Sequence, residues 1–222
     1  MLALNDYKVG ITGRRTELLE KLKNEKPESF IIKSFDIRDI NNVETKFEEL
    51  TNELGGLDLM IISSGTGEIN KQLDFDLELP TIETNITGFT CIADLSFRFF
   101  EKQKSGHLAA ISSIGGLRGS MLSPAYNASK AYQINYLEGL RQKAVKLKEE
   151  VYVTDIRPGL VDTDMAKGEG LFWVMPVDVA AKQIYKAIIR KRKIAYVTKR
   201  WYLAAILLKL IPGFIYDRMR IN

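Results

Sequence analysis

The chain has 222 residues, of which 45% are hydrophobic and 27% are charged. These values suit one globular domain with a sizeable core and exclude a disordered chain. The single cysteine, Cys91, and the single histidine, His107, exclude an internal disulfide framework and a Cys- or His-based metal site, so no metal is expected. The sequence contains no secretory signal and no apolar run long enough to span a bilayer, which predicts a cytoplasmic protein.

Short apolar runs alternate with longer helical patterns along the chain, which is typical of an α/β fold with a parallel sheet. The strands are apolar on both faces, as a sheet between two helix layers requires. We therefore expect a three-layer, doubly wound parallel sheet in a single domain over residues 1–222. The predicted strands are 8–12, 30–35, 57–62, 108–112, 151–156 and 194–197. The predicted helices are 16–24, 42–54, 80–104, 125–149 and 177–190. Thr16 is expected to cap the first of these helices, and Gly88 interrupts the pattern of the third.

Unusual polar residues and glycines gather directly after the predicted strands. In open parallel sheets, ligands bind beyond the carboxyl ends of the strands. The clusters are Arg14-Arg15, Asp36, residues 63–67, Ser112-Ser113 and Pro158-Gly159. Their position predicts one ligand site at this edge of the sheet.

Tyr126 and Lys130 lie four residues apart near the start of a predicted helix, so they share one helix face. Of the nine tyrosines, Tyr126 alone has a lysine four positions later. A phenol with an ordinary pKa of about 10 exchanges protons poorly at neutral pH, and an ammonium group one turn away favours the phenolate. The pair therefore suits a general acid/base, although one such pair is also expected by chance in a lysine-rich chain.

Ser113 and Asn85 add polar groups to this pair. Ser113 follows a strand and precedes Gly115-Gly116, which allow close approach of the backbone, so its hydroxyl could bind a substrate oxygen beside the tyrosine. Asn85 lies inside a predicted helix, where asparagine is a mediocre helix former. It is either a solvent-facing polar residue or the holder of a water that relays protons toward Lys130.

Five segments together resemble the short-chain dehydrogenase/reductase family, from about residue 5 to residue 200. Ser113 lies thirteen residues before Tyr126, which is the spacing usual in that family. The resemblance implies a Rossmann-like fold in which Tyr126 is the general acid/base and Ser113 orients the substrate. It also implies that Lys130 lowers the pKa of the tyrosine and contacts the nicotinamide ribose, and that Asn85 completes the proton relay. The segments are LDLMIISSG (57–65), NITG (85–88), ISSIGG (111–116), YNASK (126–130) and RPGLVDT (157–163).

The same resemblance implies the cofactor contacts. Arg14 and Arg15 stand where an acidic residue would bind the ribose hydroxyls of NAD, and arginine there favours the 2′-phosphate of NADP. NADP is therefore expected, with NAD as the alternative, unless both arginines only begin a solvated helix. The other positions that match cofactor contacts of the family are Asp36 and Ile37 beside the adenine, Ser63, Ser64 and Gly65 after the third predicted strand, Tyr126, Lys130, and Pro158, Gly159 and Thr163 around the nicotinamide and pyrophosphate.

Two features depart from the family pattern. Residues 63–65 read Ser-Ser-Gly where the family usually has Asn-Ala-Gly. The first strand of the family and its glycine-rich turn, which cradles the pyrophosphate, are not found before residues 2–6, which look like the end of the helix that follows this turn. Either the sequence begins at an internal methionine of a longer protein, or the chain is as given and its dinucleotide binding is badly weakened.

The C-terminal region is apolar and basic. From Lys186 onward the chain has ten Lys or Arg and one acidic residue. The tail over residues 201–222 could lie at an anionic membrane surface, cover the substrate mouth or form a dimer contact, or it could be a solvated helix with a charged rim. By the same resemblance, residues 164–176 correspond to a lid over the substrate. The helices at 80–104 and 125–149 correspond to helices through which members of the family form dimers or tetramers.

The sequence thus predicts an NADP-dependent oxidoreductase that moves a hydride between the nicotinamide and the carbon of a carbonyl or alcohol. The substrate is expected to be a small, hydrophobic molecule, with no nucleic-acid partner. Two other readings stay open: a catalytically silent binding or scaffold protein that cannot hold the dinucleotide, and a protein attached to a membrane surface.

Overall fold

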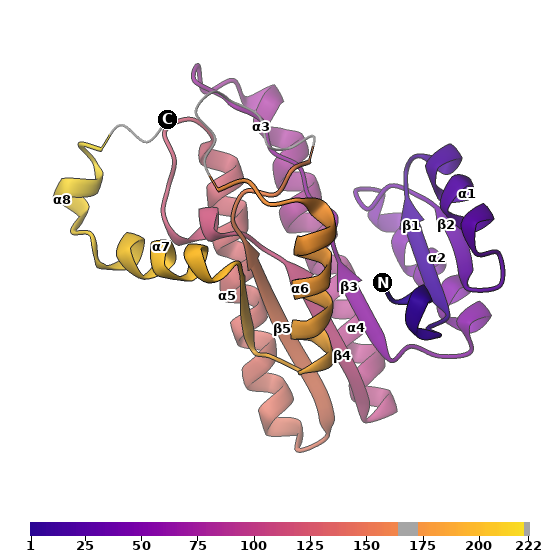
Figure 1. Ribbon diagram of the computed structural model, residues 1–222. Helices are drawn as coiled ribbons and strands as arrows, with labels where there is room; N and C mark the ends of the chain where they lie inside the picture. Colours follow the sequence, from indigo (N-terminus) through magenta and orange to yellow (C-terminus); the bar gives the residue numbers. More distant parts are fainter. Residues whose placement is uncertain (164–172, 220–222) are drawn as a thin grey trace.

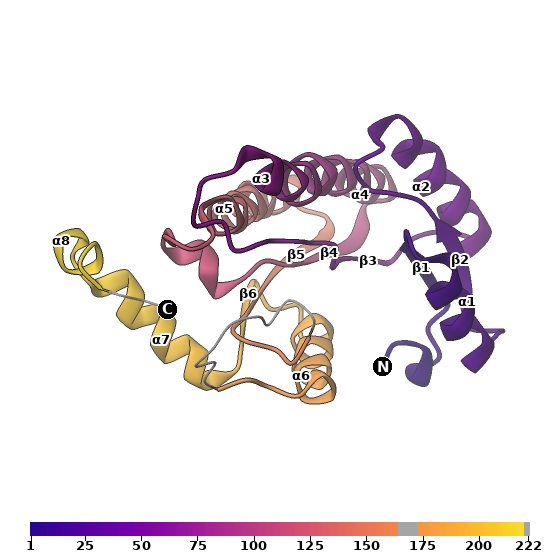
Figure 2. The ribbon, with the colours of Figure 1, turned by 90° about the horizontal axis from the view of Figure 1, so that it is seen from above.

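The computed structural model describes residues 1–163 and 173–219. Parallel strands lie between helices on both sides (Figure 1, Figure 2), so the α/β prediction is confirmed. The strands are β1 (Val9–Gly13), β2 (Phe30–Ser34), β3 (Leu59–Ile62), β4 (Ser105–Ile111), β5 (Glu150–Pro158) and β6 (Ile194–Val197). The helices are η1 (Ala3–Asn5), α1 (Thr16–Glu25), α2 (Ile40–Leu54), α3 (Phe75–Ile82), η2 (Glu83–Gly88), α4 (Phe89–Gln103), η3 (Ile114–Leu117), α5 (Pro124–Leu147), α6 (Val177–Ile189), α7 (Lys199–Leu210) and α8 (Gly213–Tyr216).

The helix predicted from residue 80 begins earlier, at Phe75. Its cap is Asp74, whose side chain accepts a hydrogen bond from the backbone N–H of Asp76 at 3.0 Å, and a carboxylate is a strong cap. The prediction began at Pro80 because proline suits a first helical turn. A similar correction applies to Thr16, which is the first residue of α1 rather than its cap, since Arg15 occupies the cap position.

The sheet is divided into two hydrogen-bonded parts. β1 pairs with β2, and β3, β4, β5 and β6 pair in that order, all in parallel. Within the described residues, no strand pairing joins β1 to β3, although Figure 1 places β1 between β2 and β3. β2, β1, β3, β4 and β5 follow the doubly wound order 3-2-1-4-5-6 if its first strand is left out and β1 is counted as the second, and β6 adds one further strand beside β5.

Side-chain packing between α2 and α4 joins the two parts of the sheet. Val43 and Phe47 of α2 belong to the same hydrophobic cluster as Phe89 of α4. The rings of Phe47 and Phe99 meet edge to face with their centroids 6.1 Å apart. The β1–β2 pair is therefore held by buried apolar contacts rather than by a continuous ladder of hydrogen bonds.

The C-terminal helices α7 and α8 extend away from the sheet, on the side opposite β1 and β2 (Figure 1). Trp201 packs inward and is 5% exposed, while Arg118 Nε donates to the carbonyl of Leu208 at 2.9 Å, near the end of α7. Pro212 and Gly213 end this helix, as the sequence predicts. Residues 2–6, expected to end an α-helix, form only the short 3₁₀ turn η1, and residues 164–172 of the expected lid lie outside the described residues.

Two kinds of site are not found in the described part of the chain. None of its helices is long and apolar enough to cross a membrane. None of its His, Cys, Asp and Glu side chains form a group that could hold a metal ion.

Candidate active site

The four residues predicted to be catalytic come from three neighbouring parts of the fold. Ser113 follows β4, Asn85 lies in η2, and Tyr126 and Lys130 occupy the first two turns of α5. The Ser113 hydroxyl hydrogen-bonds the phenol of Tyr126, and Lys130 Nζ lies 5.8 Å from the centre of the tyrosine ring. The structure therefore brings the serine, the tyrosine and the lysine together.

The pKa of Tyr126 differs in direction from the sequence-based expectation. Burial raises the pKa of the phenol above its ordinary value, and the hydrogen bond with Ser113 acts in the opposite direction. Removing the phenol from water disfavours its charged form, and Lys130 does not contribute the expected lowering of this pKa. A protonated phenol at neutral pH is the form that can donate a proton.

Lys130 is only 4% exposed, and its ammonium group is held by two acceptors. Nζ donates to the backbone carbonyl of Ile111 and to Gln133 Oε1, each at 3.0 Å. Burial lowers the pKa of Lys130 to about 8, and the charge of Asp155 opposes this shift. Proton exchange by Lys130 near neutral pH therefore becomes accessible.

Asp155 and Arg157 form a buried ion pair beneath this site. Arg157 Nε and Nη2 both lie 2.6 Å from Asp155 Oδ2, and the Ser112 hydroxyl donates to Asp155 Oδ1 at 2.5 Å. Both charged side chains are at most 3% exposed. Asp155 also raises the pKa of Lys130 through its charge and so favours the ammonium form of the lysine.

Asn85 is fully buried, which excludes a solvent-facing role. It lies in the π-helical segment η2, a rare distortion that is frequent at functional sites. Its Nδ2 donates to the Thr66 carbonyl at 2.7 Å and to Ser129 Oγ at 2.9 Å, while its Oδ1 accepts from the Thr66 N–H at 2.9 Å. The side chain thus fixes the backbone of the loop after β3.

Three glycines leave room for the catalytic side chains. A Cβ at Gly67 would lie 2.4 Å from Tyr126 Cδ2, and one at Gly116 would lie 2.6 Å from the Lys130 carbonyl carbon. A Cβ at Gly65 would lie 3.3 Å from Lys130 Nζ. The loops after β3 and β4 therefore approach α5 more closely than residues with side chains would allow.

The residues expected to contact the adenine end of a dinucleotide cluster after β1 and β2. Arg14 Nη1 lies 3.8 Å from Asp36 Oδ2, and the arginine side chain is 66% exposed, as a ligand contact requires. Arg38, which the sequence reasoning missed, also pairs with Asp36 at 2.7 Å and lowers the pKa of that carboxyl group. Arg15 is exposed at the start of α1.

Ile37 has a different setting from these polar residues. A Cβ at Gly88 would lie 2.7 Å from the backbone carbonyl oxygen of Ile37. The side chain of Ile37 packs against the main hydrophobic cluster. Ile37 therefore joins the segment after β2 to the helical segment η2 that carries Asn85.

The residues after β3 fit a polar ligand in part. Ser63 is exposed, whereas the Ser64 hydroxyl is buried and has no hydrogen-bond partner among the described residues. A buried hydroxyl without a partner is costly, and the Ser64 hydroxyl therefore fits a dinucleotide that supplies the missing partner. The glycine-rich turn of the family has no counterpart among the described residues, so the fit concerns the nicotinamide side of the ligand.

The last three predicted cofactor residues follow β5. Gly159 has a packing role, because a Cβ there would lie 2.1 Å from Trp201 Cε2. Pro158 is buried at the end of the strand, and Thr163 is exposed, with its hydroxyl 3.3 Å from the Val161 carbonyl. These residues lie at the same sheet edge as the catalytic group.

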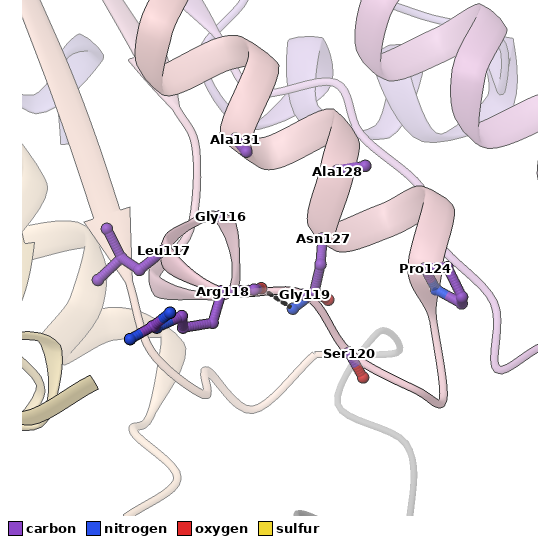
Figure 3. A pocket seen from close by; sticks show the side chains of 9 residues that line it. All are labelled: Gly116, Leu117, Arg118, Gly119, Ser120, Pro124, Asn127, Ala128 and Ala131. Carbon is purple, nitrogen blue, oxygen red and sulfur yellow. Dashed lines mark hydrogen bonds between the residues drawn. The ribbon is translucent and has the colours of Figure 1, made fainter. Parts of the chain in front are cut away.

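A cavity of 450 Å³ lies beside the start of α5 (Figure 3). The segment 116–120 lines it together with Pro124, Asn127, Ala128 and Ala131. Asn127 Nδ2 donates to the Arg118 carbonyl at 2.8 Å and closes one side. Tyr126, Ser113 and Lys130 do not line it, so this cavity is not the space in front of the phenol.

Sequence reasoning missed several residues that hold the site. Gln133 was detectable, because it lies three positions after Lys130 and so shares its helix face. Ser129 belongs to the YNASK segment but gave no separate signal. Thr66 acts through its backbone, which leaves no mark in the sequence.

Comparison with known proteins agrees with this geometry. The short chain dehydrogenase family matches residues 1–171. An uncharacterized oxidoreductase of Myxococcus xanthus is 30% identical over 226 residues, which cover 97% of this chain and 87% of the relative.

Two solved structures share the fold. ElxO with NADP bound has a TM-score of 0.75 at 20% identity, over 87% of this chain and 88% of the other. A short chain dehydrogenase/reductase from Burkholderia phymatum in complex with NAD has a TM-score of 0.78 at 14% identity, over 90% and 83%. With its Rossmann-like fold, the chain belongs to the short-chain dehydrogenase family.

Proposed function

We propose that this protein is an NADP-dependent oxidoreductase that interconverts a carbonyl group and an alcohol. The observation that carries the proposal is that Ser113 and Lys130 both lie beside the phenol of Tyr126. The dinucleotide, when bound, supplies the hydride that reaches the carbonyl carbon. Tyr126 donates its proton to the carbonyl oxygen, which Ser113 holds by a hydrogen bond, and Lys130 stabilises the phenolate that remains.

NADP is the favoured cofactor because cations surround the end of β2. Arg14 and Arg38 both approach Asp36, and Arg38 also lies 3.6 Å from Glu83, so the exposed Arg14 and Arg15 supply the positive charge for a 2′-phosphate. ElxO binds NADP and the Burkholderia protein binds NAD, so the two cofactors are the alternatives. Replacing Arg14 and Arg15 with alanine is expected to weaken NADPH binding more than NADH binding, measured by fluorescence titration.

Replacing the catalytic tyrosine tests the proposed chemistry. Tyr126→Phe is expected to abolish turnover of a panel of hydrophobic ketones and aldehydes while NADPH binding persists, because phenylalanine has no proton to donate. Tyr132→Phe is the matched control, since this tyrosine lies on the same helix and bonds Thr90 instead. Turnover by Tyr126→Phe would refute the assignment, and failure of the unmodified protein to bind NADPH would favour a silent scaffold.

We propose in addition that α7 and α8 attach the protein to an anionic membrane surface. α7 has only Trp201 and Ala205 buried, and its outer side is apolar. Lys199 and Arg200 begin α7, Lys209 lies in its last turn and Arg218 follows α8, with Asp217 as the one acidic residue of the described part of the tail. The apolar residues at least 38% exposed are Tyr202, Leu203, Ile206, Leu207, Leu210, Phe214, Ile215 and Met219.

An apolar patch with a basic rim suits the interface of an anionic bilayer. The protein should sediment with vesicles that contain phosphatidylserine, and much less with purely zwitterionic vesicles. Leu207→Glu, or deletion after Lys199, should abolish this binding, while Val145→Glu, at an exposed apolar site on α5, should not. A dimer that Leu207→Glu dissociates, with no vesicle binding by the unmodified protein, would refute the membrane role.

The remaining features of the proposal rest on the family resemblance and the exposed apolar surface. We infer a cytoplasmic protein that forms a homodimer or homotetramer through α4 and α5 and acts on a small hydrophobic substrate. Sedimentation velocity would measure the oligomeric state directly.

A further inference from the structure

The side chain of Gln133 bridges two groups of the candidate active site. It lies on α5, is only 1% exposed, and is one helical turn beyond Lys130. Its Nε2 donates to the backbone carbonyl of Asn85 at 2.9 Å, and its Oε1 accepts from Lys130 Nζ at 3.0 Å. One amide thus spans the space between η2 and the lysine.

The two partners fix the orientation of this amide. A carbonyl oxygen needs a donor and an ammonium group needs an acceptor, so only one of the two amide orientations satisfies both. The reverse orientation would place NH₂ against the ammonium and oxygen against oxygen. Buried polar networks with one satisfied arrangement hold their members rigidly.

No described residue accepts a hydrogen bond from the third N–H of the Lys130 ammonium. Two of its three N–H groups go to Ile111 O and Gln133 Oε1. Nζ lies 3.3 Å from the place where a Cβ at Gly65 would be, which locates Nζ beside the loop that carries the unpartnered Ser64 hydroxyl. The amide therefore fixes where the lysine can offer its last donor.

We propose that Gln133 is a positioning residue that takes the place of a proton-relaying water between Asn85 and Lys130. The inference rests on the proposed function and deepens it. A carboxamide at neutral pH gains and loses no proton, unlike a water molecule. Lys130 therefore exchanges protons on its Gly65 side, and Asn85 supports the site through its carbonyl and its contacts with Thr66 rather than by relaying protons.

Two substitutions of opposite character test this role. Gln133→Leu keeps the volume but removes the acceptor for Nζ, and Gln133→Glu places a carboxylate beside it. The other charged or titratable groups around Nζ are Tyr126 on α5 and Asp155 on β5, and neither changes. Gln142→Leu, at an exposed position on the same helix, is the matched control, and thermal melting checks that every variant folds.

The readout is the pH titration of Lys130, which NMR monitors through the chemical shift of its 13Cε nucleus. The variant Lys130→Arg assigns this signal, because the signal disappears in it. The midpoint should fall by about one pH unit in Gln133→Leu and rise by about one unit in Gln133→Glu. Equal midpoints in both variants, or shifts in the same direction, would overturn the proposal. The titration needs no turnover, so opposite shifts in a protein without reductase activity would refute the proposed function and leave the positioning role standing.

The pH dependence of kcat provides the second arm. In an active enzyme, the limb of the pH–kcat profile that reports the ionisation of Lys130 should move to lower pH in Gln133→Leu and to higher pH in Gln133→Glu. A purely structural defect would lower kcat without moving this limb. The solvent kinetic isotope effect should change in Gln133→Ala, because the smaller side chain makes room for water between Asn85 and Lys130. An unchanged isotope effect together with an unmoved limb would contradict the proposal.

Discussion

Burial changes the protonation chemistry of individual side chains in this protein. The pKa of Lys130 is lowered to about 8 and that of Tyr126 is raised, so burial favours the neutral form of both residues. Asp155 and Gln133 oppose this for the lysine, one by its charge and the other by accepting a hydrogen bond. The balance keeps an acid and a cation side by side at neutral pH.

His107 shows the same effect far from the site. It is 7% exposed on β4, and burial lowers its pKa to about 4. The Thr154 hydroxyl donates to the Arg192 carbonyl at 2.6 Å, so in the 2.7 Å contact between His107 Nε2 and Thr154 Oγ1 the histidine is the donor. A neutral ring with a proton on Nε2 satisfies this arrangement.

The pH dependence of stability should therefore contain a contribution from His107. The unfolded state, with a pKa of about 6.5, binds a proton that the folded state resists, so stability falls as the pH drops from 6.5 toward 4. Between pH 7.5 and pH 5.5 the loss should be about 1 kcal/mol, measured by urea denaturation. The variant His107→Gln keeps the contribution of the carboxylates but lacks that of the histidine, so the difference between the two proteins isolates His107. Equal pH slopes in both proteins would contradict the prediction.

At the scale of helices and strands, close contacts at glycine fix how elements meet. Gly88 allows η2 to meet the Ile37 carbonyl, and Gly159 allows the end of β5 to meet the Trp201 ring of α7. Arg118 then binds the carbonyl of Leu208 in the last turn of α7. The helix is thus attached near both of its ends, while its outer side stays exposed.

Gly159→Ala should weaken the attachment of α7. The added Cβ would lie about 2 Å from the indole ring, so the ring must move, and overpacking of this kind costs about 1–3 kcal/mol. We expect a lower melting temperature and a shift in the fluorescence maximum as Trp201 becomes exposed. Gly119→Ala is the control, because no atom lies within 4 Å of its added Cβ, and the two variants melting alike would refute the prediction.

In the whole molecule, the two parts of the sheet differ in how they are held. β4 and β5 each pair with a strand on both sides, whereas β1 pairs with β2 alone among the strands that the structure describes. The β1–β2 pair is linked to the main cluster through Val43 and Phe47 of α2 and through Phe35 and Ile37, which follow β2. Contact density and stability are therefore unevenly distributed.

Hydrogen exchange should detect this difference. Amides of Val9–Gly13 are expected to exchange at least about tenfold faster than those of β4 and β5, because local opening of the β1–β2 pair breaks fewer contacts. Phe47→Ala should speed exchange in β1 and β2 more than in β5. Mass spectrometry of peptides from these strands checks both expectations, and uniform protection would refute them.

The sequence was a good guide to elements and to the catalytic group. Alternation of apolar runs and helical patterns located every main strand, and the spacing of Ser113, Tyr126 and Lys130 anticipated their meeting. The start of α3 at Phe75 was missed, because Pro80 is a strong signal and Asp74 a local one. The amide bridge made by Gln133 and the packing of Gly159 against Trp201 were missed, since their partners Asn85 and Trp201 are remote in sequence and meet them only in the folded chain.

The division of the sheet has a consequence for handling the protein. β1 and β3 each present a row of backbone donors and acceptors that no other described strand uses, and such rows readily capture extended segments from other molecules. Concentrated samples of residues 1–222 should thus be prone to aggregation through intermolecular strand pairing. A short peptide of complementary apolar sequence, added before concentration, should compete for these rows and keep the protein dispersed.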